Sequence, residues 1–501
     1  MCCWRRWATR RDAGRARSRP CPGPAAGGHR RSRVTSSQGR GDTASPPPGS
    51  GSLSGQLAEF LSGLRGGVAP THLAAAGNCV IDTLGAIAYG SAQPWSMAAA
   101  RHALATGGGG ACTVVGSADP ASPAMAAFAN GTAAHAFELD DVHEEAVNHP
   151  GAVVVPAALA VSEDTDASGL AFLEAVVVGY EAMARAGLAV GPVSHMLAGF
   201  HPTSMSGVFG AAAAAAHLRG LDADRLNHAF GIAASLASGT MEFAASGGMA
   251  KRIHAGRAAE GGIMAASLAA DGFEGARDGL AGRHGFCRIF TDDPQPELLV
   301  EGLGERWMID EITVKPYASC SDVHPMVQAT FELVAEHGIR AEEIDRIAVH
   351  TTTKACELND MDGTTSVMAA QYSAPFNVAA AVLADPSDPA TFSADRIADP
   401  ALATLQAIVT LVPDLTFDAT YAWKQGARVE ITTTGGRTLE RAVHGQRGSM
   451  HDPLGDAEIE RKFHTLAEGR IDPGIPDAVR SLPDRPVSAL TRLLHSGWRS
   501  S

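Results

Sequence analysis

Residues 250–262 read A-K-R-I-H-A-G-R-A-A-E-G-G, and a segment of mostly Ala, Gly and Met follows them. A helix that begins here would place Lys251 and His254 on one face, because residues three apart are neighbours on a helical turn. Its Gly and Ala residues would let other backbones approach closely. The stretch is therefore either the floor of an anionic-substrate site in a packed interior or a basic helix start on the surface. Its potential cations are Lys251, Arg252, His254 and Arg257.

The chain from residue 52 to about 272 is predicted to be almost entirely helical. Apolar residues at helical spacing and alanine-rich runs predict helices over 56–64, 72–88, 124–137, 153–161, 171–189, 205–217 and 228–246. Thr203 or Ser204 is available to cap the helix at 205–217. The glycine-rich segment 107–110 is predicted to be a loop, and it lacks the sequence of a phosphate-binding loop.

Beyond residue 272 the pattern changes to strands alternating with helices. Strands are predicted over 346–353, 428–434 and 437–443, with Gly435 and Gly436 as a hairpin turn, and helices over 323–336, 372–383 and 456–467. We expect the last helix to return to the helical domain. The prediction is a mainly α fold with a disordered tail (1–51), a large all-helical domain (52–272 and 447–501) and a smaller α+β domain (273–446).

The composition separates a basic tail from an acidic body. The 501 residues carry a formal charge of −14, and the first fifty hold eleven Arg against two acids, so the body is more negative than the whole chain. Such a body repels nucleic acid and anionic membranes, and a small anion must be drawn in by a local cationic pocket. No run of eighteen apolar residues occurs, so we expect no membrane span.

The tail and the cysteines indicate the cellular compartment in which the protein works. The tail is interpreted as a basic extension, an over-extended start of the reading frame or a mitochondrial transit peptide. Three of the eight cysteines lie in the tail, and the others show neither CxxC spacing nor disulfide density, which is typical of a reducing compartment. We expect a cytoplasmic protein, and a mitochondrial one only if the tail is a transit peptide.

Residues 138–151 read E-L-D-D-V-H-E-E-A-V-N-H-P-G and concentrate acids and histidines. Carboxylates beside imidazoles suit a site where one group orients or protonates another. A metal site and a solvated acidic loop are the competing hypotheses, although the chain has no HExxH. Pro150 and Gly151 indicate that His149 lies in a loop. The ionisable residues are Glu138, Asp140, Asp141, His143, Glu144, Glu145 and His149.

Two further stretches carry candidate residues. F-H-P-T-S at 200–204 places His201 just before a helix. V-K-P-Y-A-S-C-S-D-V-H-P at 314–325 holds Lys315, Tyr317, Cys320 and His324. A free buried cysteine is commoner than a nucleophilic one, so Tyr317 as a hydrogen-bond donor or acid is the preferred hypothesis.

Together these segments resemble the MmgE/PrpD family. The matching pieces are I-D-T-L-G (81–85), N-G-T-A-A-H-A-F-E-L-D-D-V-H (130–143), H-P-G-A-V-V-V-P-A-A-L-A (149–160), F-H-P-T-S (200–204), A-K-R-I-H-A-G-R-A-A-E (250–260), G-R-H-G-F (282–286), K-P-Y-A-S-C-S-D-V-H-P (315–325), Q-Y-S-A-P-F (371–376) and D-A-E-I-E-R-K-F (456–463). Their order and spacing cover nearly all of residues 52–470.

The resemblance implies a helical domain with a smaller α+β lid, a homodimer, and a cleft site for a small di- or tricarboxylate that uses neither metal nor organic cofactor. It assigns catalysis to His149, His201 and Lys251, with Tyr317 as a fourth candidate. Orienting or substrate-binding roles are expected for Asp140, Asp141, Arg252, His254 and Lys315.

The family's reactions leave several functions open. Dehydration like that of 2-methylcitrate dehydratase is the first hypothesis, ahead of decarboxylation like that of cis-aconitate decarboxylase and proton transfer like that of iminodisuccinate epimerase. A helical dimer that binds or scaffolds without catalysis is the alternative outside enzymes. Decarboxylase-like members carry D-F-D-D-T, whereas this chain has E-L-D-D-V at 138–142 and one extra residue before His149.

Overall fold

The computed structural model describes residues 51–243, 248–361 and 364–496. The predictions for the basic tail, for its three cysteines and for the end of the helix at 228–246 fall wholly or partly outside these ranges. The described residues from 52 onward form one compact unit. Its structure is mainly α-helical, with one four-stranded and one two-stranded sheet among the described residues.

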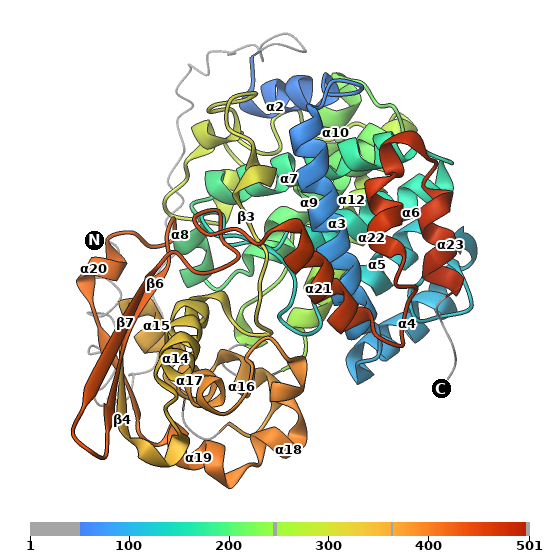
Figure 1. The fold of residues 1–501 in the computed structure, drawn as a ribbon. Coiled ribbons are helices and arrows are strands. Elements are labelled where there is room, and N and C mark those ends of the chain that lie inside the picture. The colour runs from blue at the N-terminus through green and yellow to red at the C-terminus, as the bar shows by residue number, and fades with distance from the viewer. Residues whose placement is uncertain (1–50, 244–247, 362–363, 497–501) are drawn as a thin grey trace, which may run out of the picture. The chain divides into compact units, whose positions relative to one another are not determined.

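Five helices rich in alanine and glycine form the centre of the helical part (Figure 1). α9 packs against both α7 and α12, and α12 also packs against α5 and α6. The run of alanines at 211–216 in α9 is buried along its whole length, so small side chains permit the close spacing. The bounds are α5 (Pro123–Ala134), α6 (Gly151–Asp164), α7 (Gly169–Ala189), α9 (Pro202–Leu218) and α12 (Lys251–Ala270).

The other helices of this part surround that centre. They are α2 (Leu53–Ser62), α3 (Pro70–Ser91), α4 (Pro94–Gly107), α8 (Pro192–Leu197), α10 (Ala223–Ala233), α13 (Phe286–Ile289), α22 (Ile475–Arg480) and α23 (Ser488–Ser496). By length and composition α3 could cross a membrane, but 72% of its apolar window is buried in the fold. A largely buried apolar helix is what the core of a globular protein also requires.

The basic stretch that begins α12 is buried, so the hypothesis of a surface helix start is wrong. Lys251, Arg252 and His254 are all inside, whereas Arg257 is exposed and pairs with Glu260. The predicted close approach of backbones is also present. A Cβ built on Gly256 would lie 2.3 Å from the carbonyl oxygen of Phe128 on α5, a distance that no real side chain shows.

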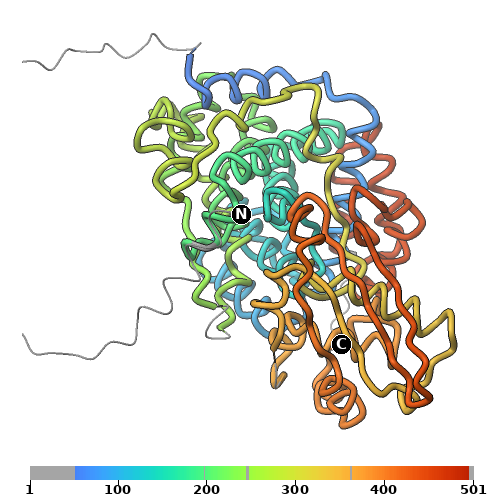
Figure 2. The backbone as a smooth tube through the Cα atoms, turned by 90° about the vertical axis from the view of Figure 1, so that its left-hand side faces the viewer, coloured from blue at the N-terminus to red at the C-terminus, as the bar shows by residue number. Residues whose placement is uncertain are grey.

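A second apolar cluster underlies the four-stranded sheet, whose strand order is β5-β4-β6-β7. β4 (Ile344–Thr351) is parallel to β5 (Val409–Pro413) and antiparallel to β6 (Gly426–Thr433), which pairs with β7 (Thr438–His444). The predicted hairpin is confirmed, and Gly436 takes the positive φ of 79° that its turn requires. In Figure 2 this hairpin is the long orange-to-red pair of tube segments.

Helices cover this sheet and connect its strands. α14 (His324–His337) packs against β6 and β7, and α17 (Ala374–Leu383) packs against α14. The remaining helices are α15 (Thr353–Leu358), α16 (Val367–Tyr372), α18 (Ala394–Ile397), α19 (Pro400–Gln406) and α20 (Leu415–Asp418).

The helix predicted at 456–467 is α21 (Asp456–Ala467), with the predicted bounds. It lies along α3 (Figure 1), and its Ile459 and Phe463 belong to the apolar cluster of the helical part. Lys462 on this helix donates to Asp82 on α3 (2.6 Å) and to the carbonyl of Leu139 (2.8 Å). The last part of the chain therefore holds the start of the acidic stretch 138–151.

Three local predictions are wrong. The helix predicted at 228–246 ends at Ala233, and Gly239 beyond it adopts a φ of 131°. The predicted loop at 107–110 includes the start of β1 (Gly108–Cys112), which bridges to Ala121. His201, not Thr203 or Ser204, is the N-cap of α9.

Gly256→Ala tests the close contact between α12 and α5. The added methyl group would force the helices apart, so we expect a loss of about 1–3 kcal/mol in the free energy of unfolding, measured by chemical denaturation. Gly261→Ala on the same helix is the control, because its Cβ would make an ordinary contact 3.4 Å from Val208. That variant should be neutral or stabilised by up to about 1 kcal/mol. Equal effects of the two variants would contradict the packing described.

Candidate active site

A short antiparallel pair brings two distant stretches of the chain together. β2 (Val142–His143) pairs with β3 (Ile312–Thr313), with Val142 opposite Thr313. The acidic stretch thereby lies against the segment that carries Lys315. The ammonium of Lys315 is buried, and its Nζ lies 3.5 Å from Oε2 of Glu138.

Lys251 meets the same carboxylate from the other side. It is the first residue of α12, is buried, and forms an ion pair with Oε1 of Glu138. Its Nζ also donates to the hydroxyl of Tyr372, at the end of α16, over 2.8 Å. Although burial opposes the shift, Lys251 and Lys315 hold the pKa of Glu138 far below its usual value. One buried carboxylate is therefore shared by two ammonium groups.

Asp140 orients two imidazoles through one oxygen. Its Oδ2 lies 2.6 Å from Nδ1 of His135 and 3.5 Å from Nδ1 of His149. The same His149 nitrogen is 2.6 Å from the backbone carbonyl oxygen of Asp141. Because a carbonyl only accepts, Nδ1 of His149 must carry the proton, which leaves a lone pair on Nε2. Burial lowers the pKa of His149 to about 3 although Asp140 opposes the shift, so the imidazole is neutral at pH 7.

The carboxylate of Asp141 holds the loop in place, whereas that of Asp140 orients imidazoles. It accepts from the hydroxyl of Tyr180 (2.6 Å) and from the backbone N–H of Gly151 (2.8 Å) at the start of α6. Burial raises its pKa to about 7. The hydroxyl of Thr203, which was expected to cap α9, instead accepts from the backbone N–H of His149 (3.2 Å). These contacts fix the loop that carries His149.

His201 and His254 extend the row of imidazoles. Their Nδ1 atoms are 3.0 Å apart, and the His201 ring lies 5.6 Å from that of His135, centroid to centroid. His135 in turn lies 5.2 Å from His149. Burial lowers the pKa of His254 to about 4 and that of His201 well below its usual value. Neutral imidazoles thus adjoin the two buried ammonium groups.

Arg252 and Tyr317 lie at the margin of this group. Arg252 donates to the carbonyl of Ala136 and stacks over Trp95, 3.9 Å from the ring centroid, so it holds the turn before Glu138. Tyr317 packs against His324, and its pKa is raised by burial and by the charges of Glu332 and Asp385, which lie outside this group. Tyr372, and not Tyr317, is the tyrosine whose hydroxyl meets Lys251.

Three members of the group were not among the expected site residues: Glu138, His135 and Tyr372. Glu138 was one acid among five in its stretch, and nothing in the spacing distinguishes it. His135 precedes the acidic stretch at the end of α5, and the turn that follows brings it to Asp140. A histidine five residues from a buried aspartate is not a helical neighbour, so helical spacing does not reveal this pair.

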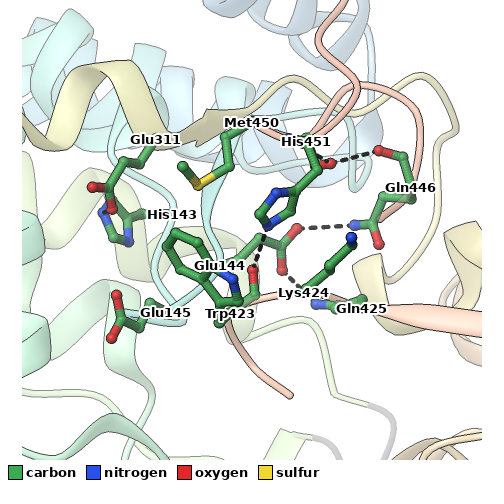
Figure 3. A pocket seen from close by; sticks show the side chains of 11 residues that line it. His143, Glu144, Glu145, Glu311, Trp423, Lys424, Gln425, Gln446, Met450 and His451 are labelled. Atoms are coloured by element: carbon green, nitrogen blue, oxygen red, sulfur yellow. Dashed lines mark hydrogen bonds and ion pairs between the residues drawn. The ribbon is translucent and has the colours of Figure 1, made fainter. Parts of the chain in front are cut away.

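The acidic stretch is divided between two surroundings. Glu138, Asp140 and His149 face Lys251 and Lys315, whereas His143, Glu144 and Glu145 line a small hollow on another side (Figure 3). In that hollow Glu144 accepts from Ser321 (2.8 Å), Gln446 (2.9 Å) and Gln425. Burial raises the pKa of Glu144 to about 7.

The hollow does not suit an anion. Its lining includes three carboxylates and one ammonium, that of Lys424. Two of these carboxylates, Glu145 and Glu311, pair with Arg306 outside the lining (2.5 and 2.6 Å). A polycarboxylate would meet like charges here, so we place the candidate site at Lys251 and Lys315. Across the described ranges, no group of three or more His, Cys, Asp or Glu residues has an arrangement suited to a metal ion.

Comparisons with known proteins agree with the family suggested by the motifs. Residues 55–299 match the model of the MmgE/PrpD N-terminal domain, and residues 317–478 match that of the C-terminal domain. The chain is 31% identical to a cis-aconitate decarboxylase-like protein of Aspergillus oryzae, over 84% of this chain and 92% of that protein. It is 29% identical to a cis-aconitate decarboxylase of Aspergillus terreus, over 84% and 91% of the two chains.

The human cis-aconitate decarboxylase is 31% identical over a shorter region, 52% of this chain and 56% of that protein. The two family models together span more than half of the present sequence, so the match covers both the helical part and the part with the sheet.

The tautomer of His149 can be measured directly. We expect long-range proton–nitrogen NMR spectra of the imidazoles to show His149 neutral, with its proton on Nδ1, from pH 8 down to pH 5. Burial disfavours the imidazolium form, and the Asp141 carbonyl fixes the proton. The spectrum of His149→Gln assigns the signals. A titration midpoint near 6.5, or a proton on Nε2, would show that the described contacts are wrong.

Proposed function

Since this chain belongs to the MmgE/PrpD family, we propose that it is a lyase that acts on a small di- or tricarboxylate bound by Lys251 and Lys315. The observation that carries the proposal is the convergence of these two buried ammonium groups on the carboxylate of Glu138. A substrate carboxylate has the same charge and geometry as the Glu138 side chain, so it can join or replace it at the same groups.

The proposed chemistry uses this positive charge to stabilise a carbanion. Loss of CO2 from an unsaturated acid leaves a carbanion that the double bond and a remaining carboxylate can delocalise, and removal of a proton next to a carboxylate leaves a carbanion conjugated with that carboxylate. Fixed cations stabilise this charge more than they stabilise the ground state, and each donor contributes roughly 3 kcal/mol. Tyr372 supports Lys251 by accepting one of its hydrogen bonds.

Histidines supply the proton transfers in this proposal. His149 is assigned the role of base, because its Nε2 carries a lone pair and its Nδ1 is held by the Asp141 carbonyl. His201, whose ring like that of His149 lies beside His135, is assigned the delivery of a proton to the carbanion. A positioned acid or base of this kind contributes on the order of a hundredfold to ten-thousandfold in rate.

Decarboxylation of a cis-aconitate-like acid is the first candidate reaction, since the relatives compared carry that activity in their names. Dehydration of a 2-methylcitrate-like hydroxy acid is the second. The chain departs from the decarboxylase motif at Glu138, which is one methylene longer than Asp, and at the buried Val142, which lacks the hydroxyl of Thr, so both reactions stay in the test. The proposal further holds the enzyme to be a cytoplasmic homodimer that needs neither metal nor organic cofactor and binds neither nucleic acid nor membrane.

A proton NMR time course of the full-length protein in D2O tests the proposal. The protein is offered cis-aconitate, 2-methylcitrate, citrate and iminodisuccinate in turn, with and without EDTA. We expect one of them to be consumed in both conditions, with the product naming the reaction; exchange of the α-proton alone would indicate epimerisation. If no substrate is consumed and no proton exchanges, the binding or scaffold alternative replaces the lyase.

Substitutions test the assignment of residues. Lys251→Ala should lower kcat by roughly a hundredfold to a thousandfold, because it removes a cation that faces the transition state. Tyr372→Phe and Tyr317→Phe form a matched pair that removes one hydroxyl each. We expect Tyr372→Phe to lower kcat at least about tenfold and Tyr317→Phe to leave it within about twofold. A larger loss of kcat in Tyr317→Phe than in Tyr372→Phe would assign the catalytic role to Tyr317 instead.

A further inference from the structure

In the contact between His201 and His254, the same atom of each imidazole, Nδ1, faces the other. Their Nδ1 atoms lie 3.0 Å apart, with ring centroids at 5.0 Å and planes tilted by 43°. Phe243 packs edge-on against both rings, at 5.5 Å from His201 and 5.8 Å from His254. The backbone N–H of His201 donates to the carbonyl of Gly239 (3.1 Å), which fixes the first ring at the start of α9.

This contact restricts the protonation of the pair. A hydrogen bond between two Nδ1 atoms requires that one of them carry the proton and the other not. Two neutral imidazoles in this contact are therefore opposite tautomers. One has its proton on Nδ1 and a lone pair on Nε2, and the other has its proton on Nε2. The two tautomers exchange when the shared proton moves across, the donor ring takes up a proton on Nε2 and the other ring loses the proton on its Nε2.

The surroundings of His201 make a charged imidazole costly. The groups that act most strongly on it after burial are His135, His254, Lys251 and His149, all of them neutral or positive. His254, on α12, is also near His135 and Lys251 and is also buried, but with 8% of its surface exposed against 5% for His201 it is the more exposed of the two. His201 can therefore take up a proton at lower cost if the proton on its Nδ1 passes to His254.

We propose that His254 is the proton-relay partner of His201. When His201 accepts a proton on Nε2, the proton on its Nδ1 passes to Nδ1 of His254, and His254 releases the proton on its Nε2 to solvent. Run in reverse, the same steps deliver a proton from solvent to the substrate through His201. Each imidazole gains one proton and loses one, so no charge accumulates. The inference deepens the proposed function and rests on it for the substrate.

Substitution of His254 separates relay from positioning. His254→Asn places an amide near the position of Nδ1, where it can keep the hydrogen bond to His201 but cannot pass a proton. We expect kcat to fall at least about tenfold with KM changed less than about twofold. His254→Ala should regain several-fold in kcat with added imidazole. His228→Asn, on α10, is the matched control and should leave kcat unchanged.

Full kcat in His254→Asn would overturn the relay, because a hydrogen bond alone would then suffice. A readout independent of turnover accompanies the kinetics: the nitrogen spectrum of the resting protein should show His201 and His254 as opposite tautomers. Two imidazoles with the same tautomer would also overturn the inference. If no substrate in the panel is consumed, the proposed function fails, while the spectrum still decides whether the pair shares a proton.

Discussion

The buried carboxylate of Glu138 between two ammonium groups is the interaction on which the rest of the site depends. Lys251 and Lys315 come from distant parts of the chain, and both are almost fully removed from water. A buried charge without a partner costs several kcal/mol, and removal of one partner of such a pair typically costs about 3–5 kcal/mol. Glu138 adopts a φ of 56°, a conformation that costs a non-glycine residue about 1–2 kcal/mol. The ion pairs offset this cost, and they also define a place that accepts carboxylates.

The fold serves this arrangement by holding short distances. Alanine and glycine on α5, α9 and α12 let the helices pack closely enough that Lys251 meets Glu138 and that His201 lies between His135 and His254. The pair β2–β3 sets Lys315 against that loop, and Lys462 on α21 holds the carbonyl of Leu139. Segments from the beginning, middle and end of the chain thus fix one loop.

Much of the fold could be predicted from local sequence, because its helices and hairpin follow simple periodicities. α21 has the predicted bounds, and the hairpin of β6 and β7 turns at the predicted glycines. The failures concern residues whose role depends on partners far along the chain. Thr203 looked like a helix cap, but its hydroxyl receives the N–H of His149. Tyr317 and Tyr372 both lie in family motifs, and only the three-dimensional arrangement shows which hydroxyl meets Lys251. Lys251, His201 and His149 were expected from the sequence, whereas His135 and Glu138 required the structure.

The most direct measurement is a crystal structure of the protein with propane-1,2,3-tricarboxylate, a saturated tricarboxylate that has no hydroxyl group to eliminate and no double bond to assist decarboxylation. We predict one of its carboxylates within hydrogen-bond distance of Nζ of both Lys251 and Lys315, beside Glu138 or in its place, with the ligand reaching toward Nε2 of His149. A ligand bound in the hollow beside Glu144, or one that leaves both ammonium groups paired with Glu138 alone, would contradict the account.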